Sequence, residues 1–165
     1  EMVDQFREGV SDITNEGQVA DFLRKIIRKE EGDGSGLVYG MGHAVYTLSD
    51  PRAKILKSKA QEFAMNSEFE KEFILLDTIE RLTPEIFAEI KGVNKAMCAN
   101  VDLYSGLVYK MLDIPPDLFT PIFTAARVAG WSAHRIEELL TGGKIIRPAY
   151  KNTNIPNKYI SIDNR

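Results

Sequence analysis

The residues best suited to chemistry surround His43, one of only two histidines in the 165-residue chain. The stretch 36–43 reads GLVYGMGH and sets Gly36, Gly40 and Gly42 ahead of the imidazole. Glycine permits left-handed backbone and close approach of a ligand to the main chain. A loop with free backbone N–H groups beside a helix start suits an anionic ligand, and His43 would act there as a donor or acid. The alternative is an ordinary glycine-rich turn whose histidine is hydrogen-bonded within the fold.

Two further charged residues, Asp102 and Arg127, could take part in such a site. Asp102 falls in the first turn of a helix that Asn100 is expected to cap, where a carboxylate normally complements the helix dipole but could also act as a base. Arg127 stands four residues after Phe123 and four before Trp131, on a stripe of large apolar side chains. A guanidinium on an apolar face needs an anion, which is either an internal carboxylate or a bound substrate.

The elements that must position these residues are helices, because apolar residues recur at helical spacing and strand signals are almost absent. The sequence therefore predicts an all-α fold. The predicted helices cover 1–9, 17–31, 51–64, 68–82, 83–90, 101–112 and 117–140. The short helix near 83–90 is expected to begin at Thr83-Pro84-Glu85. Residues 37–49 are expected to form a loop with a short extended piece at 36–39. Asp50 and Pro51 are expected to begin the third helix, and Gly142-Gly143 to end the last.

Composition narrows the function classes. The formal net charge is −3 and the basic residues are dispersed, which argues against a nucleic-acid partner. Cys98 is the only cysteine, so no internal disulfide can form and a reducing, cytoplasmic location is expected. Apolar runs are too short for a membrane span, the chain opens with no leader-like segment, and no metal site or cofactor is predicted.

Three motifs in fixed order carry a resemblance to a known family. They are GMGHAVYTLSDPRA at 40–53, NVDLYSG at 100–106 and AARVAGW at 125–131. Together they resemble the citrate synthase family over about residues 1–150, and the match is to roughly its C-terminal two-fifths. The closely related 2-methylcitrate synthases, which use propionyl-CoA, share these motifs. The resemblance implies a multi-helical small domain at 1–113, and at 114–165 the long helix and extended tail of the large domain.

The resemblance also implies roles in condensing acetyl-CoA with oxaloacetate and water to give citrate and CoA. Asp102 is the implied base that removes the α-proton of the thioester. His43 is the implied group that polarises the oxaloacetate carbonyl as negative charge develops. Arg52, Arg127 and Arg147 are the implied clamps on its carboxylates, with Arg147 reaching the partner subunit's site.

The same resemblance assigns CoA contacts. The loop of Leu37, Val38, Tyr39, Gly40, Met41 and Gly42 is implied to wrap the adenine with its backbone, with Lys95 and Asn100 as further contacts. Acetyl-CoA is a substrate here rather than a cofactor. Thr47 stands where some members carry a basic residue for a CoA phosphate, which weakens the expected phosphate contact.

One family element is missing from these 165 residues. The family uses another histidine, in a His-Gly-Gly-like motif, and His134 on the long predicted helix does not match it. With the helical character of residues 1–9, this predicts a fragment of a homodimeric enzyme that is inactive alone and that self-associates through the apolar face of 117–140. The alternatives are a 2-methylcitrate synthase fragment and a non-catalytic helical module that binds acyl-CoA or a protein.

Overall fold

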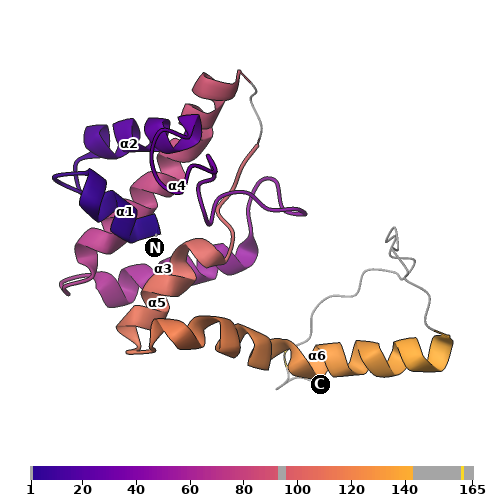
Figure 1. Cartoon of the computed structure of the whole chain (residues 1–165). Helices are drawn as coiled ribbons and strands as arrows, with labels where there is room; N and C mark the ends of the chain where they lie inside the picture. Colours follow the sequence, from indigo (N-terminus) through magenta and orange to yellow (C-terminus); the bar gives the residue numbers. More distant parts are fainter. Residues whose placement is uncertain (1, 93–95, 143–160, 162–165) are drawn as a thin grey trace. The chain divides into compact units, whose positions relative to one another are not determined.

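The computed structural model describes residues 2–92, 96–142 and 161, and these residues form helices joined by loops (Figure 1). The elements in chain order are α1 (Met2–Gly9), α2 (Glu16–Arg28), α3 (Pro51–Ala64), α4 (Glu70–Lys91), α5 (Asp102–Met111), the short 3₁₀ helix η1 (Pro116–Leu118) and α6 (Phe119–Thr141). Within the described part of the chain no strand is present, which confirms the all-α prediction.

Local sequence explains where α2 and α3 begin. Asn15 accepts a hydrogen bond from the Gln18 N–H at 3.1 Å and thereby caps α2. Asp50 caps α3 in the same way and is followed by Pro51, whose fixed φ suits the first helical position. The predicted start of α3 is therefore confirmed.

The core lies where α2 packs on α4 and α3 packs on α5, as Figure 1 shows. Its largest fully buried side chains come from all of α1, α2, α4 and α5: Phe6, Leu23, Ile27, Leu75, Leu76, Ile79, Tyr104 and Leu107. Since Arg52 lies in the first turn of α3 and Asp102 begins α5, this packing sets where those predicted site residues lie.

A partly buried polar cluster ties α3 and α5 to α4. The Lys57 ammonium lies 2.5 Å from Asp77 Oδ1 and 2.8 Å from Glu80 Oε2, and the Tyr104 hydroxyl donates to the same Glu80 oxygen at 2.5 Å. Burial first, and then the hydrogen bond to Glu80, raise the pKa of Tyr104 well above its usual value. The phenol therefore stays protonated and serves as a fixed donor.

The predicted break at Thr83-Pro84-Glu85 is wrong, because α4 runs without interruption from Glu70 to Lys91. Pro84 has no N–H for the helix ladder, which disfavours a helix interior. The Thr83 hydroxyl nevertheless donates to the Ile79 carbonyl at 2.6 Å, and Thr83 and Ile86 are both buried. Packing on both sides of the proline outweighs the missing backbone bond.

Two smaller expectations also need correction. Helix α2 ends at Arg28 rather than near 31, because Lys29 adopts a left-handed φ of 67° and its N–H returns to the Ile26 carbonyl. The extended piece expected at 36–39 is not formed; the only bridge among the described residues joins Met41 to Ala99.

The chain divides into two compact units, Glu1–Phe123 and Thr124–Arg165, with the division inside α6. The first unit holds the core described above. The second holds most of α6, which contains no buried residue. The domain boundary implied by the resemblance, between 113 and 114, stays a prediction. None of the described helices is both long and apolar enough to cross a bilayer.

Candidate active site

A glycine loop packs directly against the start of α5. Gly40 and Gly42 have φ values of 85° and 92°, in the left-handed region that favours glycine. A Cβ placed on Gly40 would lie 2.7 Å from the Leu103 Cα, so only glycine lets the loop approach α5 this closely. The loop is held there by two backbone bonds, from the Gly42 N–H to the Cys98 carbonyl at 2.7 Å and from the Asn100 N–H to the Gly40 carbonyl at 2.8 Å.

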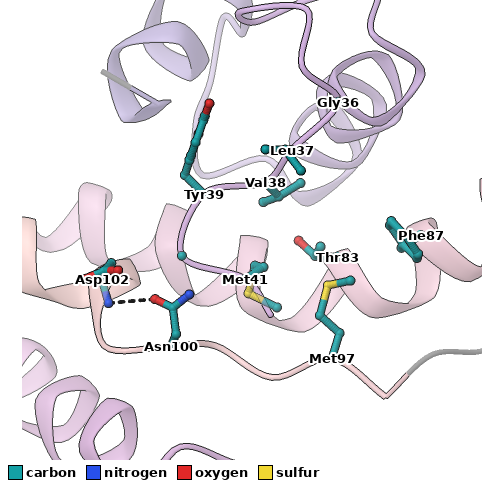
Figure 2. A pocket seen from close by; sticks show the side chains of 11 residues that line it. Gly36, Leu37, Val38, Tyr39, Met41, Thr83, Phe87, Met97, Asn100 and Asp102 are labelled. Atoms are coloured by element: carbon teal, nitrogen blue, oxygen red, sulfur yellow. Dashed lines mark hydrogen bonds between the residues drawn. The ribbon is translucent and has the colours of Figure 1, made fainter. Parts of the chain in front are cut away.

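Beneath this loop lies a cavity of about 280 Å³ (Figure 2). It is lined by the loop, by two α4 side chains and by the segment before α5: Gly36, Leu37, Val38, Tyr39, Gly40, Met41, Thr83, Phe87, Met97, Asn100 and Asp102. Among the described residues, the backbone N–H groups of Val38 and Gly40 have no hydrogen-bond partner. The cavity therefore offers apolar and sulfur-bearing walls together with free main-chain donors, which suits a flat heteroaromatic ring.

His43 follows the loop with its ring orientation fixed by the main chain. Its Nδ1 accepts hydrogen bonds from the Val45 N–H at 2.9 Å and the Tyr46 N–H at 3.0 Å. Because Nδ1 acts as an acceptor, the proton of the neutral ring lies on Nε2. Arg52 Nη2 lies 3.2 Å from His43 Nε2, so with the proton on Nε2 both groups are donors that an oxygen of a ligand could bridge.

Arg52 is held in place by the buried carboxylate of Asp50. Asp50 Oδ1 accepts from the Arg52 backbone N–H at 2.9 Å and from Nε at 3.0 Å, while Oδ2 accepts from Nη2 at 2.8 Å. The hydrogen bonds from the Arg52 side chain lower the pKa of Asp50 to about 2, against the opposing effect of burial. The Arg52 side chain is still about half exposed, so its guanidinium can also reach an incoming anion.

Asp102 borders the same cavity at the first turn of α5. Its backbone N–H donates to Asn100 Oδ1 at 2.9 Å (Figure 2). The Asn100 amide Nδ2 donates in turn to the Gly42 carbonyl at 2.9 Å. Asn100 thus connects the glycine loop to the residue that carries the candidate base. The pKa of Arg52 is raised, first by its hydrogen bond with Asp50 and further by nearby charges that include Asp102, so the Asp102 carboxylate lies within electrostatic range of Arg52.

The structure therefore gathers three of the predicted polar residues, His43, Arg52 and Asp102, in the first unit together with the loop and Asn100. Arg127 is half-buried on α6 and belongs to the second unit, which is described separately. Lys95 and Arg147 lie outside the described residues. The described residues hold no cluster of three or more His, Cys, Asp or Glu side chains arranged to bind a metal ion.

Sequence reasoning missed three cavity-lining side chains, Thr83, Phe87 and Met97. Thr83 and Phe87 are four residues apart on one face of α4, but Thr83 was expected only to begin a short helix. Met97 comes from the segment before α5, where nothing in the local pattern indicated a site residue.

Comparison with known proteins gives one consistent result. A family model described as "Citrate synthase, C-terminal domain" matches residues 2–149. The chain is 43% identical over 111 residues to a citrate synthase of Synechocystis sp., covering 67% of this chain and 26% of that protein. It is 33% identical over 160 residues to a 2-methylcitrate synthase of Shewanella oneidensis, covering 96% of this chain and 39% of that protein.

A solved structure gives the same relationship in three dimensions. The ternary complex of carboxymethyl coenzyme A and oxaloacetate with citrate synthase from Thermoplasma acidophilum superposes with a TM-score of 0.66 at 28% identity, covering 99% of this chain and 40% of that one. The chain therefore spans well under half the length of the relatives it matches.

Proposed function

Because the chain belongs to the citrate synthase family, we propose that it is the part of such an enzyme that binds CoA and carries two of the groups that condense acetyl-CoA with oxaloacetate. The observation that supports this most strongly is that the glycine loop leading to His43 lines one cavity together with Asp102, while Arg52 lies 3.2 Å from the His43 ring. The Thermoplasma relative binds a CoA derivative and oxaloacetate together, and we propose that this chain contacts the same two kinds of ligand.

In the proposed reaction, Asp102 removes a proton from the carbon next to the thioester carbonyl. The C–H electron pair becomes the enolate, and the proton passes to the Asp102 carboxylate. The enolate carbon then attacks the ketone carbon of oxaloacetate and forms the new carbon–carbon bond, while the π pair of the ketone moves onto its oxygen. That oxygen takes up a proton and becomes the hydroxyl of the citryl thioester. Water finally cleaves the citryl thioester to give citrate and free CoA. Positioning of the base against the α-carbon supplies much of the acceleration in such a step.

His43 stabilises the charge that develops on the ketone oxygen. Its Nε2–H is the available donor because Nδ1 already accepts two backbone hydrogen bonds. A donor that is fixed before the reaction stabilises an oxyanion without reorganising. Arg52, oriented by Asp50, is proposed to bind one carboxylate of oxaloacetate, with Arg127 and Arg147 as further carboxylate ligands in the complete enzyme.

The nucleotide of CoA is proposed to occupy the cavity under the glycine loop. The unpaired N–H groups of Val38 and Gly40 would meet acceptor atoms of the adenine, while Met41, Met97 and Phe87 would contact its faces. Lys95 and Asn100 are further proposed contacts. Calorimetric titration of the chain with CoA tests this directly, and binding by the chain is the expected result.

The complete reaction is proposed to need more than these residues. The chain holds no His-Gly-Gly-like motif and covers only 26% of the Synechocystis enzyme. We therefore expect no condensation by the chain alone. For the complete enzyme we propose a homodimer in the cytoplasm. In that enzyme Asp102→Ala should abolish turnover and leave oxaloacetate binding nearly unchanged. Persisting turnover would contradict the assignment of the base.

The 2-methylcitrate synthase of Shewanella supports a second candidate, condensation of propionyl-CoA. One methylene changes binding in an apolar pocket by only about 1–3 kcal/mol, so the two activities differ by modest packing. Rates with acetyl-CoA and propionyl-CoA, measured side by side on the complete enzyme, separate them. A non-catalytic acyl-CoA module is the third candidate, and the presence of the motif residues His43, Arg52 and Asp102 together in this chain argues against it.

A further inference from the structure

Among the described residues, the cavity proposed to hold the nucleotide has no cation in its lining. Asp102 is the only charged side chain among these described lining residues, and its charge is negative. Coenzyme A carries a diphosphate and a 3′-phosphate, all anionic, so a cation beside this lining would favour its binding. The choice of this cation rests on the proposed function, because it concerns the phosphates of CoA.

Lys29 lies beside Gly36, which lines the cavity. A Cβ placed on Gly36 would lie 3.0 Å from Lys29 Cγ and 3.3 Å from Lys29 Cε. The aliphatic part of the lysine therefore runs along the Gly36 backbone. Its ammonium stands one bond beyond Cε, close to a residue that forms the cavity wall.

The backbone of Lys29 is unusual for its residue type. Its φ of 67° is left-handed, a conformation that glycine adopts freely and that asparagine and aspartate tolerate. The other described non-glycine residues with positive φ are Asn66 and Asp113, which belong to the tolerant types. A lysine in this position gives up stability, and strain of this kind is often found at functional sites.

The charge of Lys29 is also not neutralised within the described part of the chain. Lys29 makes no ion pair or side-chain hydrogen bond there, whereas nearby Lys25 pairs with Glu31 at 3.7 Å and Arg24 pairs with Glu89 at 3.2 Å. An exposed ammonium that has no counter-ion in the described part of the chain, beside this cavity, is available for an anionic ligand.

We propose that the Lys29 ammonium binds a phosphate of CoA whose adenine lies under the glycine loop. The contact attracts the nucleotide and favours phosphorylated CoA over pantetheine. The phosphate is either the 3′-phosphate or the diphosphate, and the ligand series below distinguishes these two.

Isothermal titration of the full 165-residue chain tests the proposal. The ligands are CoA, 3′-dephospho-CoA and pantetheine, each at two salt concentrations. Lys29→Gln should weaken CoA binding by about three- to tenfold, with a smaller effect at high salt because salt screens exposed charges. Lys59→Gln is the matched control, because Lys59 is an exposed lysine of α3 that pairs with Glu62 at 2.7 Å, and it should change nothing.

The ligand series identifies the phosphate. If Lys29→Gln weakens CoA but not dephospho-CoA, the contact is to the 3′-phosphate; if it weakens both, the contact is to the diphosphate. Equal CoA affinity in Lys29→Gln and the unaltered chain would overturn this proposal while leaving the proposed function in place. Failure of the unaltered chain to bind CoA at all would overturn both.

Lys29→Gly separates binding from folding. Glycine relieves the left-handed strain, so the melting temperature should rise by roughly 2–4 °C while CoA affinity falls as in Lys29→Gln. A variant that is more stable and binds more weakly cannot be explained by a damaged fold. Unchanged affinity in this stabilised variant would also contradict the proposal.

Discussion

Replacing Gly40 by alanine is the most informative single change in the candidate site. Gly40 and Gly42 both have left-handed φ values, 85° and 92°, so an alanine at either position carries the same backbone penalty of roughly 1–2 kcal/mol. Their surroundings differ completely. A Cβ on Gly42 would meet nothing within 4 Å, whereas a Cβ on Gly40 would lie 2.7 Å from Leu103 Cα and 2.9 Å from Leu103 N.

The clash sets the size of the difference. Carbon atoms pack at about 3.5–4.0 Å, so the loop or the start of α5 must move by roughly 1 Å to accommodate the new methyl group. The contact is to backbone, which cannot rotate away, and such overpacking costs about 1–3 kcal/mol. We therefore expect Gly40→Ala to lower the free energy of unfolding by about 1–3 kcal/mol more than Gly42→Ala. The shift also strains the bond from the Asn100 N–H to the Gly40 carbonyl.

Urea unfolding followed by far-ultraviolet circular dichroism measures this difference, with Gly42→Ala as the matched control. Calorimetry on the same samples should show a greater loss of CoA affinity in Gly40→Ala. Equal stability of the two variants would refute the inference that the loop packs against the first turn of α5.

Three further expectations concern other parts of the chain. The hydrogen bonds from Ser35 and from the Tyr39 hydroxyl lower the pKa of Asp33 to about 2. The contribution of Asp33 to stability is therefore present above the unfolded pKa near 4 and is lost as the pH falls toward 2. Asp33→Asn should flatten that part of the curve of stability against pH, and an unchanged curve would count against the contact. Tyr104→Phe should cost about 1–2 kcal/mol in urea unfolding, since it removes the donor to Glu80, and a neutral effect would show that the cluster does not hold α5. The apolar surface of α6, which includes Leu139 at 66% exposed, should make the chain self-associate. Sedimentation velocity should therefore show oligomers of the unaltered chain, and Leu139→Glu should dissociate them. A monodisperse monomer of the unaltered chain would contradict this.

Helices were the most predictable part of this fold, because their signals are local. The cap and proline at Asp50-Pro51 and the apolar period of α2 were sufficient to place α3 and α2. The error at Pro84 shows the limit of such signals. A proline after threonine is a typical helix start, and only burial of Thr83 and Ile86 in the folded core keeps α4 continuous.

The motifs supplied the candidate residues of the site. The sequence predicted roles for His43, Arg52 and Asp102, which stay predictions, but the contact that brings the His43 loop to the segment before Asp102 was not visible in it. The antiparallel contact of 40–42 with 98–100 joins segments almost sixty residues apart. Neither segment has the alternating apolar pattern from which a strand pairing could be predicted. Lys29 could not be predicted as a site neighbour, because its position beside Gly36 depends on a left-handed turn at a residue that rarely adopts one.

The central claim is that the cavity under the glycine loop receives the nucleotide of CoA beside His43 and Asp102. Titration of the isotope-labelled chain with CoA, followed by backbone amide NMR, tests it most directly. Saturable shifts are expected at residues 36–42, at Met97 and at Asn100, with little change at the remote hollow lined by Phe63, Phe69 and Leu112. Shifts confined to that remote hollow, or no shifts at saturating CoA, would contradict the claim.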